Sequence, residues 1–134
     1  LKGRRNERML KIYTSGSFLD TGEVPAEVQE KIIAMASSYF DRILIESRPE
    51  FVTEETLIPL RERAGNTGLE VAVGLESADD EVLLHSINKG FRFRDFVRAA
   101  EVLRSLRIPL RTYLLLKPLF MSEAGAVRDA ISSI

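Results

Sequence analysis

Four clusters of polar and glycine residues each follow a short apolar run in this chain, and they hold the residue types best suited to binding or catalysis. The clusters are Thr-Ser-Gly-Ser-Phe at 14–18, Glu-Ser-Arg-Pro-Glu at 46–50, Gly-Leu-Glu-Ser at 74–77 and Lys-Pro at 117–118. Turn and cap chemistry explains any one such cluster. A set of four such clusters, each placed after an apolar run, predicts a ligand site. That site would combine carboxylates, an amine and accessible backbone N–H groups.

The first two clusters offer backbone amides and a carboxylate. Ser15, Gly16 and Ser17 present N–H groups with little side-chain obstruction, so a carboxylate or an amino acid moiety can approach them. Glu46 directly follows an apolar run, where a carboxylate is costly to bury unless it is paired or binds a cation or a ligand donor. Arg48 is a candidate salt-bridge partner for Glu46.

The last two clusters add a second carboxylate and an amine. Glu76 follows the apolar run 71–75, and the same burial argument applies to it. Lys117 can neutralise these carboxylates or hold a substrate carboxylate. His85 is the only histidine, and it lies in a helical pattern away from the clusters. We interpret His85 as a packing or surface residue, and nothing supports a Ser–His–Asp triad.

The apolar runs predict strands that are buried on both faces of a parallel sheet, because they are largely aliphatic with little polar alternation. They are Leu10–Tyr13, Ile43–Ile45, Val71–Leu75 and Tyr113–Leu116. Helical spacing of apolar residues separates them. In the helix expected after Pro25, the inward residues are Val28, Ile32, Met35 and Tyr39, and in the helix after Thr53 they are Leu57 and Leu60. In the third long helix they are Phe93, Phe96, Val97, Ala100 and Leu103, and in the helix after Ser122 they are Val127, Ile131 and Ile134.

The resulting order, β-α-β-α-β-α-α-β-α, predicts an α/β fold of about four parallel strands with flanking helices. Either a partial (β/α) barrel or a doubly wound sheet accommodates it. In both, the carboxyl ends of the strands share one rim that carries the ligand site. We expect a single domain over residues 1–134, with a flexible basic arm at 1–9. That arm is either a frayed, solvated end or a basic patch for RNA.

The composition sets limits on the class of protein. The chain has 134 residues, a formal net charge of -1 and no cysteine, which excludes disulfides, thiolate zinc sites and cysteine-held clusters within these residues. Apolar runs are too short for a membrane span and no secretory signal is present, so we expect a cytoplasmic protein without a membrane partner. Leu1 is not Met and Ile134 ends inside an expected helix, so we expect the sequence to be a piece of a longer protein.

The four clusters and one further motif resemble those of radical S-adenosylmethionine (SAM) enzymes. The matching segments are Ser-Gly-Ser-Phe-Leu-Asp at 15–20, Glu-Ser-Arg-Pro-Glu-Phe at 46–51, Gly-Leu-Glu-Ser at 74–77 with Ile-Asn-Lys-Gly at 87–90, and Tyr-Leu-Leu-Leu-Lys-Pro at 113–118. These details are most similar to the archaeal radical SAM family of archaeosine biosynthesis. The resemblance covers nearly the whole chain from Leu10 onward.

The resemblance implies a partial radical SAM barrel with a SAM site at the strand ends. Ser15, Gly16 and Ser17 would hold the methionine part, Glu46 and Glu76 would accept from the ammonium or the ribose hydroxyls, and Lys89 would pair with the SAM carboxylate. Arg48 and Lys117 would bind substrate or neutralise the carboxylates. No residue of the chain is assigned as a metal ligand.

The same resemblance implies the reaction of the whole enzyme. A reduced [4Fe–4S] cluster would cleave SAM to a 5′-deoxyadenosyl radical that abstracts hydrogen from the substrate. That substrate would be a lysine-modified deazaguanine in tRNA, with the lysine added beforehand by a partner transferase. The family's Cys-x3-Cys-x2-Cys loop is absent from these residues, so this fragment is expected to be inactive. Glu76 stands where relatives often have Gln, and Lys89 where they have Arg.

Two other classes of function remain open at the level of sequence. A non-radical (β/α)-barrel lyase or aldolase would use Lys117 as a Schiff-base amine and Glu46 or Glu76 as the base. An RNA-binding module is the third class. Two features count against it: the net charge of the chain is near zero, and only 7% of its residues are aromatic, which provides no platform for base stacking. In all cases, four parallel strands leave two open edges, so we expect association of the chain in solution.

Overall fold

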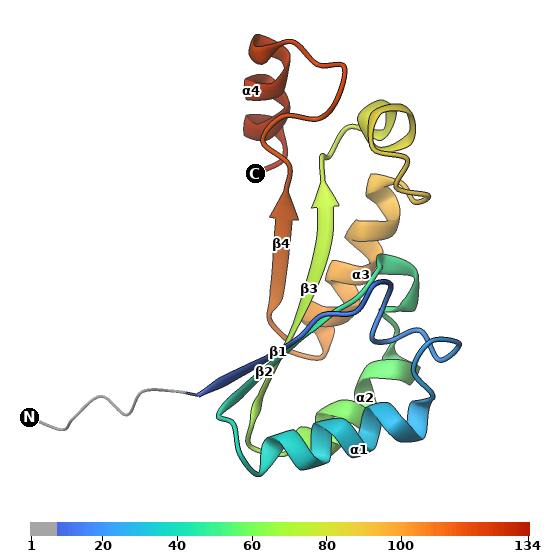
Figure 1. Cartoon of the computed structure of the whole chain (residues 1–134), viewed down its shortest axis with the longest axis vertical. Coiled ribbons are helices and arrows are strands. Elements are labelled where there is room, and N and C mark those ends of the chain that lie inside the picture. Colours follow the sequence, from blue (N-terminus) through green and yellow to red (C-terminus); the bar gives the residue numbers. More distant parts are fainter. Residues whose placement is uncertain (1–7) are drawn as a thin grey trace, which may run out of the picture.

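The computed structural model of the chain describes residues 8–134, in which a four-stranded sheet is flanked by helices (Figure 1). The strands are β1 (Met9–Ile12), β2 (Arg42–Glu46), β3 (Gly68–Glu76) and β4 (Leu110–Leu114). The helices are α1 (Ala26–Ser37), α2 (Glu54–Ala64), α3 (Phe93–Ser105) and α4 (Glu123–Ser132), with a 3-10 turn, η1 (Pro49–Phe51), and a π-helical turn, η2 (Val82–Ser86). Of the predicted arm, residues 1–7 lie outside the described residues, whereas Met9 is the first residue of β1.

All neighbouring strands pair in parallel, in the order β1-β2-β3-β4. This confirms the predicted α/β fold with four parallel strands and flanking helices. A doubly wound sheet reverses its strand order and carries helices on both faces. Here the order follows the chain without reversal and α1, α2 and α3 pack on one face, which is the winding of a (β/α) barrel. The barrel is not closed by these residues (Figure 1).

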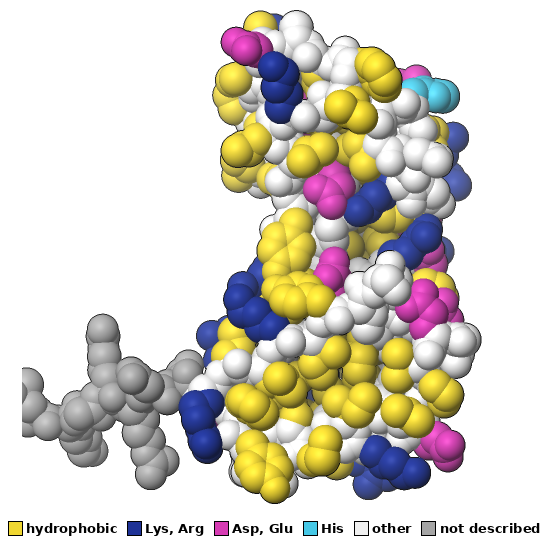
Figure 2. Space-filling model, viewed as in Figure 1, with side chains coloured by type: hydrophobic (Ala, Val, Ile, Leu, Met, Phe, Trp, Pro, Cys, Tyr) yellow, Lys and Arg dark blue, Asp and Glu magenta, His cyan; other side chains and the backbone are white. Residues whose placement is uncertain are grey.

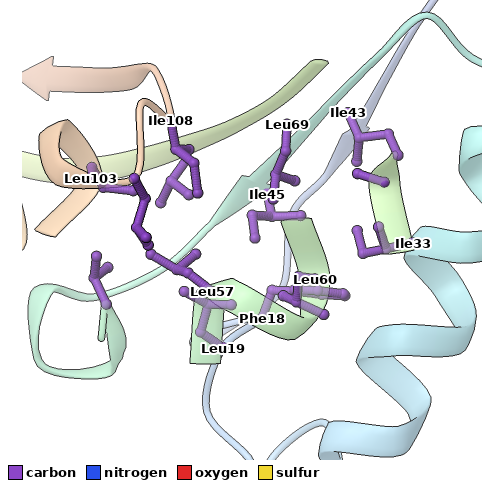
Figure 3. Close-up of a cluster of buried hydrophobic side chains, with 14 of the residues drawn as sticks. Phe18, Leu19, Ile33, Ile43, Ile45, Leu57, Leu60, Leu69, Leu103 and Ile108 are labelled. Atoms are coloured by element: carbon purple, nitrogen blue, oxygen red, sulfur yellow. The ribbon is translucent and has the colours of Figure 1, made fainter. Parts of the chain in front are cut away.

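The main hydrophobic core lies between the sheet and these three helices (Figure 3). Ile43 and Ile45 of β2 point into it together with Ile33 of α1, Leu57 of α2 and Leu103 of α3, and each is at most 1% exposed. Full burial of such a side chain contributes about 1.5–3 kcal/mol. The core therefore fixes which face of each strand meets the helices.

Because side chains alternate along a strand, every second residue faces away from these helices, onto what we call the open face of the sheet. The open face comprises Lys11, Tyr13, Arg42, Leu44, Glu46, Glu70, Ala72, Gly74, Arg111 and Tyr113. The polar members of this set lie at both ends of the sheet and determine where ligands can bind.

The predicted inward face of α1 is wrong. Met35 and Tyr39 are 64% and 61% exposed, and the buried residues of this helix are instead Gln29, Ile33 and Ala36. The helix carries two adjacent apolar stripes, and the one with the small Ala36 faces the sheet. Gln29 is buried because its side-chain amide donates to the carbonyl of Val24 at 2.7 Å.

The predicted fourth strand begins three residues too late. β4 runs from Leu110, opposite Val71 of β3, to Leu114, and Leu116 beyond it is 82% exposed. The three leucines at 114–116 suggested a buried strand, but the pairing is set earlier, where Arg111 reaches a carboxylate on β3.

Capping of α4 by Ser122 is confirmed, because its hydroxyl accepts from the N–H of Gly125, but the predicted inward face of this helix is wrong. Val127 and Ile131 are 59% and 69% exposed, and Figure 2 shows hydrophobic side chains on the surface at this end of the molecule. α4 is oriented instead by Asp129, whose buried carboxylate accepts a 2.6 Å hydrogen bond from the Ser77 hydroxyl.

The remaining helices follow the prediction more closely. Thr53 caps α2, and Leu57 and Leu60 are buried as predicted. In α3, Leu103 is buried as predicted, whereas Phe93 and Val97 are partly exposed.

Candidate functional site

A cavity of about 310 Å³ opens at the carboxyl ends of β1, β2 and β3. Its lining comes from four segments that are far apart in the sequence. They contribute Thr14, Ser15 and Gly16, then Glu46, Ser47 and Arg48, then Gly74, and finally Asn88, Lys89 and Phe91. The structure therefore brings together the first three predicted clusters and the Ile-Asn-Lys-Gly motif.

Five of the eight predicted site residues line this cavity, namely Ser15, Gly16, Glu46, Arg48 and Lys89. Glu76 adjoins it, because its carboxylate Oε1 lies 3.0 Å from Lys89 Nζ. Ser17 and Lys117 do not line the cavity. Lys117 is exposed, and its Nζ lies 3.5 Å from Glu123 Oε1.

The Glu76–Lys89 ion pair depends on the backbone around it. Glu76 has φ of 70° and follows an irregularity in the β3–β4 register, which turns its side chain back over the strand. Asn88 and Gly90 also have positive φ and bracket Lys89. Gly74 leaves the necessary space, since a Cβ there would lie 2.8 Å from Glu76 Oε1 and 3.1 Å from Lys89 Nζ. The glycine at 74 is therefore part of the site.

Glu46 is the unpaired carboxylate of the cavity. It is the last residue of β2 and is half-buried, and within the described chain its carboxylate makes no hydrogen bond or ion pair. Arg48 is not its partner, which corrects the sequence-based expectation, because Arg48 pairs with Glu50 at 2.7 Å instead. A half-buried free carboxylate beside a cavity favours a ligand that brings its own positive charge or hydroxyl donors.

The loop after β1 is held in place by Ser17. This residue is fully buried, and its hydroxyl accepts a 2.9 Å hydrogen bond from the backbone N–H of Arg48. Its own N–H donates to the carboxylate of Glu23, which also occupies the space that a Cβ on Gly16 would need. Ser17 thus ties the first cluster to the second, and the lining itself is formed by Ser15 and Gly16.

Sequence reasoning assigned no function to the other five lining residues, which are Thr14, Ser47, Gly74, Asn88 and Phe91. The first four lie inside the motifs, whereas Phe91 directly follows the last of them. The Thr14 hydroxyl oxygen is buried and has no hydrogen-bond partner among the described residues. The Phe91 ring centre lies 5.9 Å from Lys89 Nζ. The available signal for Phe91 was its position directly after Gly90, where the chain turns back to the cavity.

The open face carries two further polar contacts, one near the amino ends of the strands and one near their carboxyl ends. Glu70 is buried, and its carboxylate accepts from Arg42 and from Arg111, both at 2.7 Å. This bond with Glu70 raises the pKa of Arg111 above its ordinary value.

The hydroxyls of Tyr13 and Tyr113 lie 3.1 Å apart, and this hydrogen bond is the main reason that the pKa of Tyr113 is raised. An interruption of the apolar run at Glu70 was the only sequence signal for these contacts.

Over residues 8–134, no cluster of three or more His, Cys, Asp or Glu side chains is placed to hold a metal ion. His85 is exposed and lies 3.4 Å from Glu81 in an i,i+4 pair, in agreement with its predicted surface role. In the same range, no helix has both the length and the apolar character that a membrane crossing requires.

Comparison with known proteins found no matching family model. Two curated relatives are named archaeosine synthase subunit beta. One, from Methanosarcina acetivorans, is 44% identical over 96% of this chain and 38% of its own length. The other, from Thermococcus kodakarensis, is 43% identical over 100% of this chain and 42% of its own length. An uncharacterized protein of Methanocaldococcus jannaschii is 41% identical over 92% of this chain.

The matches to these two relatives cover nearly all of this chain. The chain spans about two fifths of the length of the two named relatives. It is thus homologous, over almost all of its residues, to a minor part of proteins named archaeosine synthase subunit beta.

Proposed function

We propose that the chain is the SAM-binding part of a radical SAM enzyme that forms archaeosine in tRNA. The observation that carries the proposal is the cavity at the strand ends, where Glu46, Lys89, Ser15 and Gly16 meet around about 310 Å³. The names of two relatives support the link to archaeosine. Pockets of about 300–1,000 Å³ are typical of small-molecule and cofactor sites.

The cavity residues fit the charge pattern of SAM. The amino acid end of SAM carries an ammonium and a carboxylate, and its ribose carries two hydroxyls. Glu46 offers a free carboxylate for the ammonium or the hydroxyls, and Lys89 offers an ammonium for the carboxylate. Gly16 and Gly74 leave room for backbone contacts, and the Phe91 ring provides an apolar wall. The buried, unpaired hydroxyl of Thr14 supplies one more polar partner.

Lys89 would exchange partners when SAM binds. Without ligand its ammonium pairs with Glu76, and both side chains are about one quarter exposed. A ligand carboxylate can compete for Lys89, while Glu76 becomes free to accept from a ribose hydroxyl. The chain's residues then bind and orient the cofactor and exclude water from it, whereas the radical that starts the reaction is supplied by SAM itself.

The [4Fe–4S] cluster does not fit the residues present, because the chain contains no cysteine and such clusters are held by cysteine thiolates. We therefore assign no step of the reaction to these residues through a cluster. Its ligands would come from other parts of the enzyme. A separate partner transferase would attach lysine to the base beforehand. The proposed substrate remains the lysine-modified deazaguanine of tRNA.

Of the two other classes, no observation favours the lyase or aldolase. A Schiff-base lysine is activated by burial in an apolar pocket or by a neighbouring cation. Lys117 is exposed and its closest charged neighbour is the carboxylate of Glu123. Both conditions are therefore missing at Lys117.

The test of the proposal is an anaerobic assay of the full-length enzyme that contains this chain. After reconstitution with iron and sulfide, the protein is given SAM and dithionite, and 5′-deoxyadenosine is quantified. We expect its formation in the wild type and a loss of at least tenfold in Glu46→Gln, with Glu101→Gln on the exposed face of α3 as the matched control. A well-folded enzyme that forms no 5′-deoxyadenosine would refute the radical SAM assignment.

A further inference from the structure

A second cavity, of about 200 Å³, lies at the opposite end of the sheet from the cavity described above. It is formed where β3 begins at Gly68 and where Pro109 precedes β4. Three arginines line it: Arg42 at the start of β2, Arg61 in the last turn of α2 and Arg107 after α3. We call this cavity the arginine cleft.

The arginine cleft has an excess of positive charge. Its acidic lining residue is Glu70, whose carboxylate is shared between Arg42 and Arg111 at 2.7 Å each. Among the residues that the structure describes, Arg61 and Arg107 form no ion pair. Two guanidinium groups are thus left free to bind an external anion, beside a third that is only half neutralised.

The backbone at Arg107 adopts an unusual conformation. Arg107 has φ of 56°, in the turn where Ile108 N–H donates back to the carbonyl of Leu103 at 2.9 Å. A residue in this position after a helix is usually glycine, because side chains strain the left-handed conformation. Non-glycine residues persist in such conformations where the surrounding structure holds them there, so the position of Arg107 beside the cavity is fixed.

Guanidinium groups bind phosphate in a planar, often bidentate geometry. Such contacts are the main source of affinity for nucleic acid backbones. We propose that the arginine cleft binds the phosphodiester backbone of the RNA substrate, with Arg61 and Arg107 as its principal contacts. The choice of RNA rests on the proposed function. The cleft then holds a stretch of the RNA backbone at one end of the sheet, while the modified base of the same RNA reaches the strand-end cavity at the other end.

The test measures binding of a fluorescently labelled tRNA transcript to the chain by anisotropy, in the absence of SAM, over a series of salt concentrations. Arg61→Ala/Arg107→Ala is compared with Arg94→Ala/Arg128→Ala, which removes two exposed, unpaired arginines of α3 and α4 and gives the same net charge. Urea midpoints of both variants confirm that each is folded.

We expect the cleft variant to bind at least tenfold more weakly, with the slope of log K against log[salt] reduced by about 2, whereas the control stays within about twofold of wild type. Equal losses in both variants would mean that only net charge matters and would overturn the proposal, as would wild-type chain that does not bind RNA. Because SAM is absent, a failure of the proposed cofactor site leaves this result unchanged. Intact, cleft-dependent RNA binding in a chain that does not bind SAM would therefore refute the SAM assignment alone.

Discussion

Lys89 Nζ and Glu76 Oε1 lie 3.0 Å apart directly over Gly74, although they are 13 positions apart in the chain. The pair holds an ammonium and a carboxylate beside the strand-end cavity, and neither side chain is fully buried. Both can therefore be exchanged for the carboxylate and the hydroxyls of a ligand at low cost. The predictions for the cavity follow from this pair and from the free carboxylate of Glu46.

Gly74→Ala should abolish measurable SAM binding by the chain. The added Cβ would lie 2.8 Å from Glu76 Oε1, so the ion pair must move into the cavity. Gly68→Ala on the same strand is the control, because its Cβ would meet its nearest atom, Arg42 Cγ, at 3.4 Å, an ordinary contact distance. Calorimetric titration with SAM measures both variants. Equal affinity in Gly74→Ala and wild type would show that the cavity over Gly74 is not the site.

Glu46→Gln should weaken SAM binding about tenfold or more, because a hydrogen bond to a charged group contributes about 1.5–3 kcal/mol. The substitution keeps the size of the side chain and removes its charge. Glu101→Gln, on the solvent side of α3, should leave the affinity unchanged. If both variants bind SAM as the wild type does, Glu46 does not contact the ligand.

The meeting of the candidate residues at one rim was predictable from the sequence, whereas the orientations of several helices and side chains were not. Ser15, Gly16 and Glu46 follow apolar runs, and parallel pairing necessarily brings such residues to one rim. The inward face of α1 was ambiguous, because Met35 and Ile33 lie on adjacent apolar stripes and only packing against the sheet selects one. The buried face of such a helix is selected by its contacts with the rest of the fold, which the spacing of apolar residues within the helix cannot predict.

Contacts between residues that are far apart in the chain could also not be predicted from the sequence pattern. Glu70 contacts Arg111 only because β4 pairs with β3 from Leu110 onward. The run of leucines at 114–116 led instead to the prediction of a strand that begins later, at Tyr113. The resemblance to radical SAM enzymes implied that Ser17 holds the methionine part of the cofactor. The loop conformation instead directs its hydroxyl to the backbone N–H of Arg48.

Tyr13→Phe should lower the pKa of Tyr113, because the hydrogen bond from Tyr13 is the largest cause of its elevation. A tyrosine pKa above the unfolded value of about 10 means that the folded state holds the proton more tightly. The stabilisation is therefore complete below pH 10 and is lost as the pH rises through the folded pKa. Titration of tyrosinate absorbance in wild type and variant measures the shift. An unchanged titration curve would mean that the two hydroxyls do not interact in solution.

Ser77→Ala should destabilise the chain by about 1–3 kcal/mol, because it leaves a buried carboxylate without its donor. The Asp129 Oδ1 accepts from this hydroxyl at 2.6 Å, and its Oδ2 is buried with no partner among the described residues. Ser105→Ala at the exposed end of α3 should change stability by less than about 0.5 kcal/mol. Urea denaturation of the two variants gives the comparison. A Ser77→Ala loss no larger than that of Ser105→Ala would contradict the proposed anchoring of α4.

The most direct test of the cofactor site is a two-dimensional ¹⁵N–¹H NMR titration of the chain with SAM. The proposal predicts that amide signals shift in a concentration-dependent manner at Ser15, Gly16, Gly74 and Lys89, and not at Gly65 or Gly68 in the arginine cleft. Signals that do not change at millimolar SAM, or that change only in the arginine cleft, would contradict the assignment of the strand-end cavity to SAM.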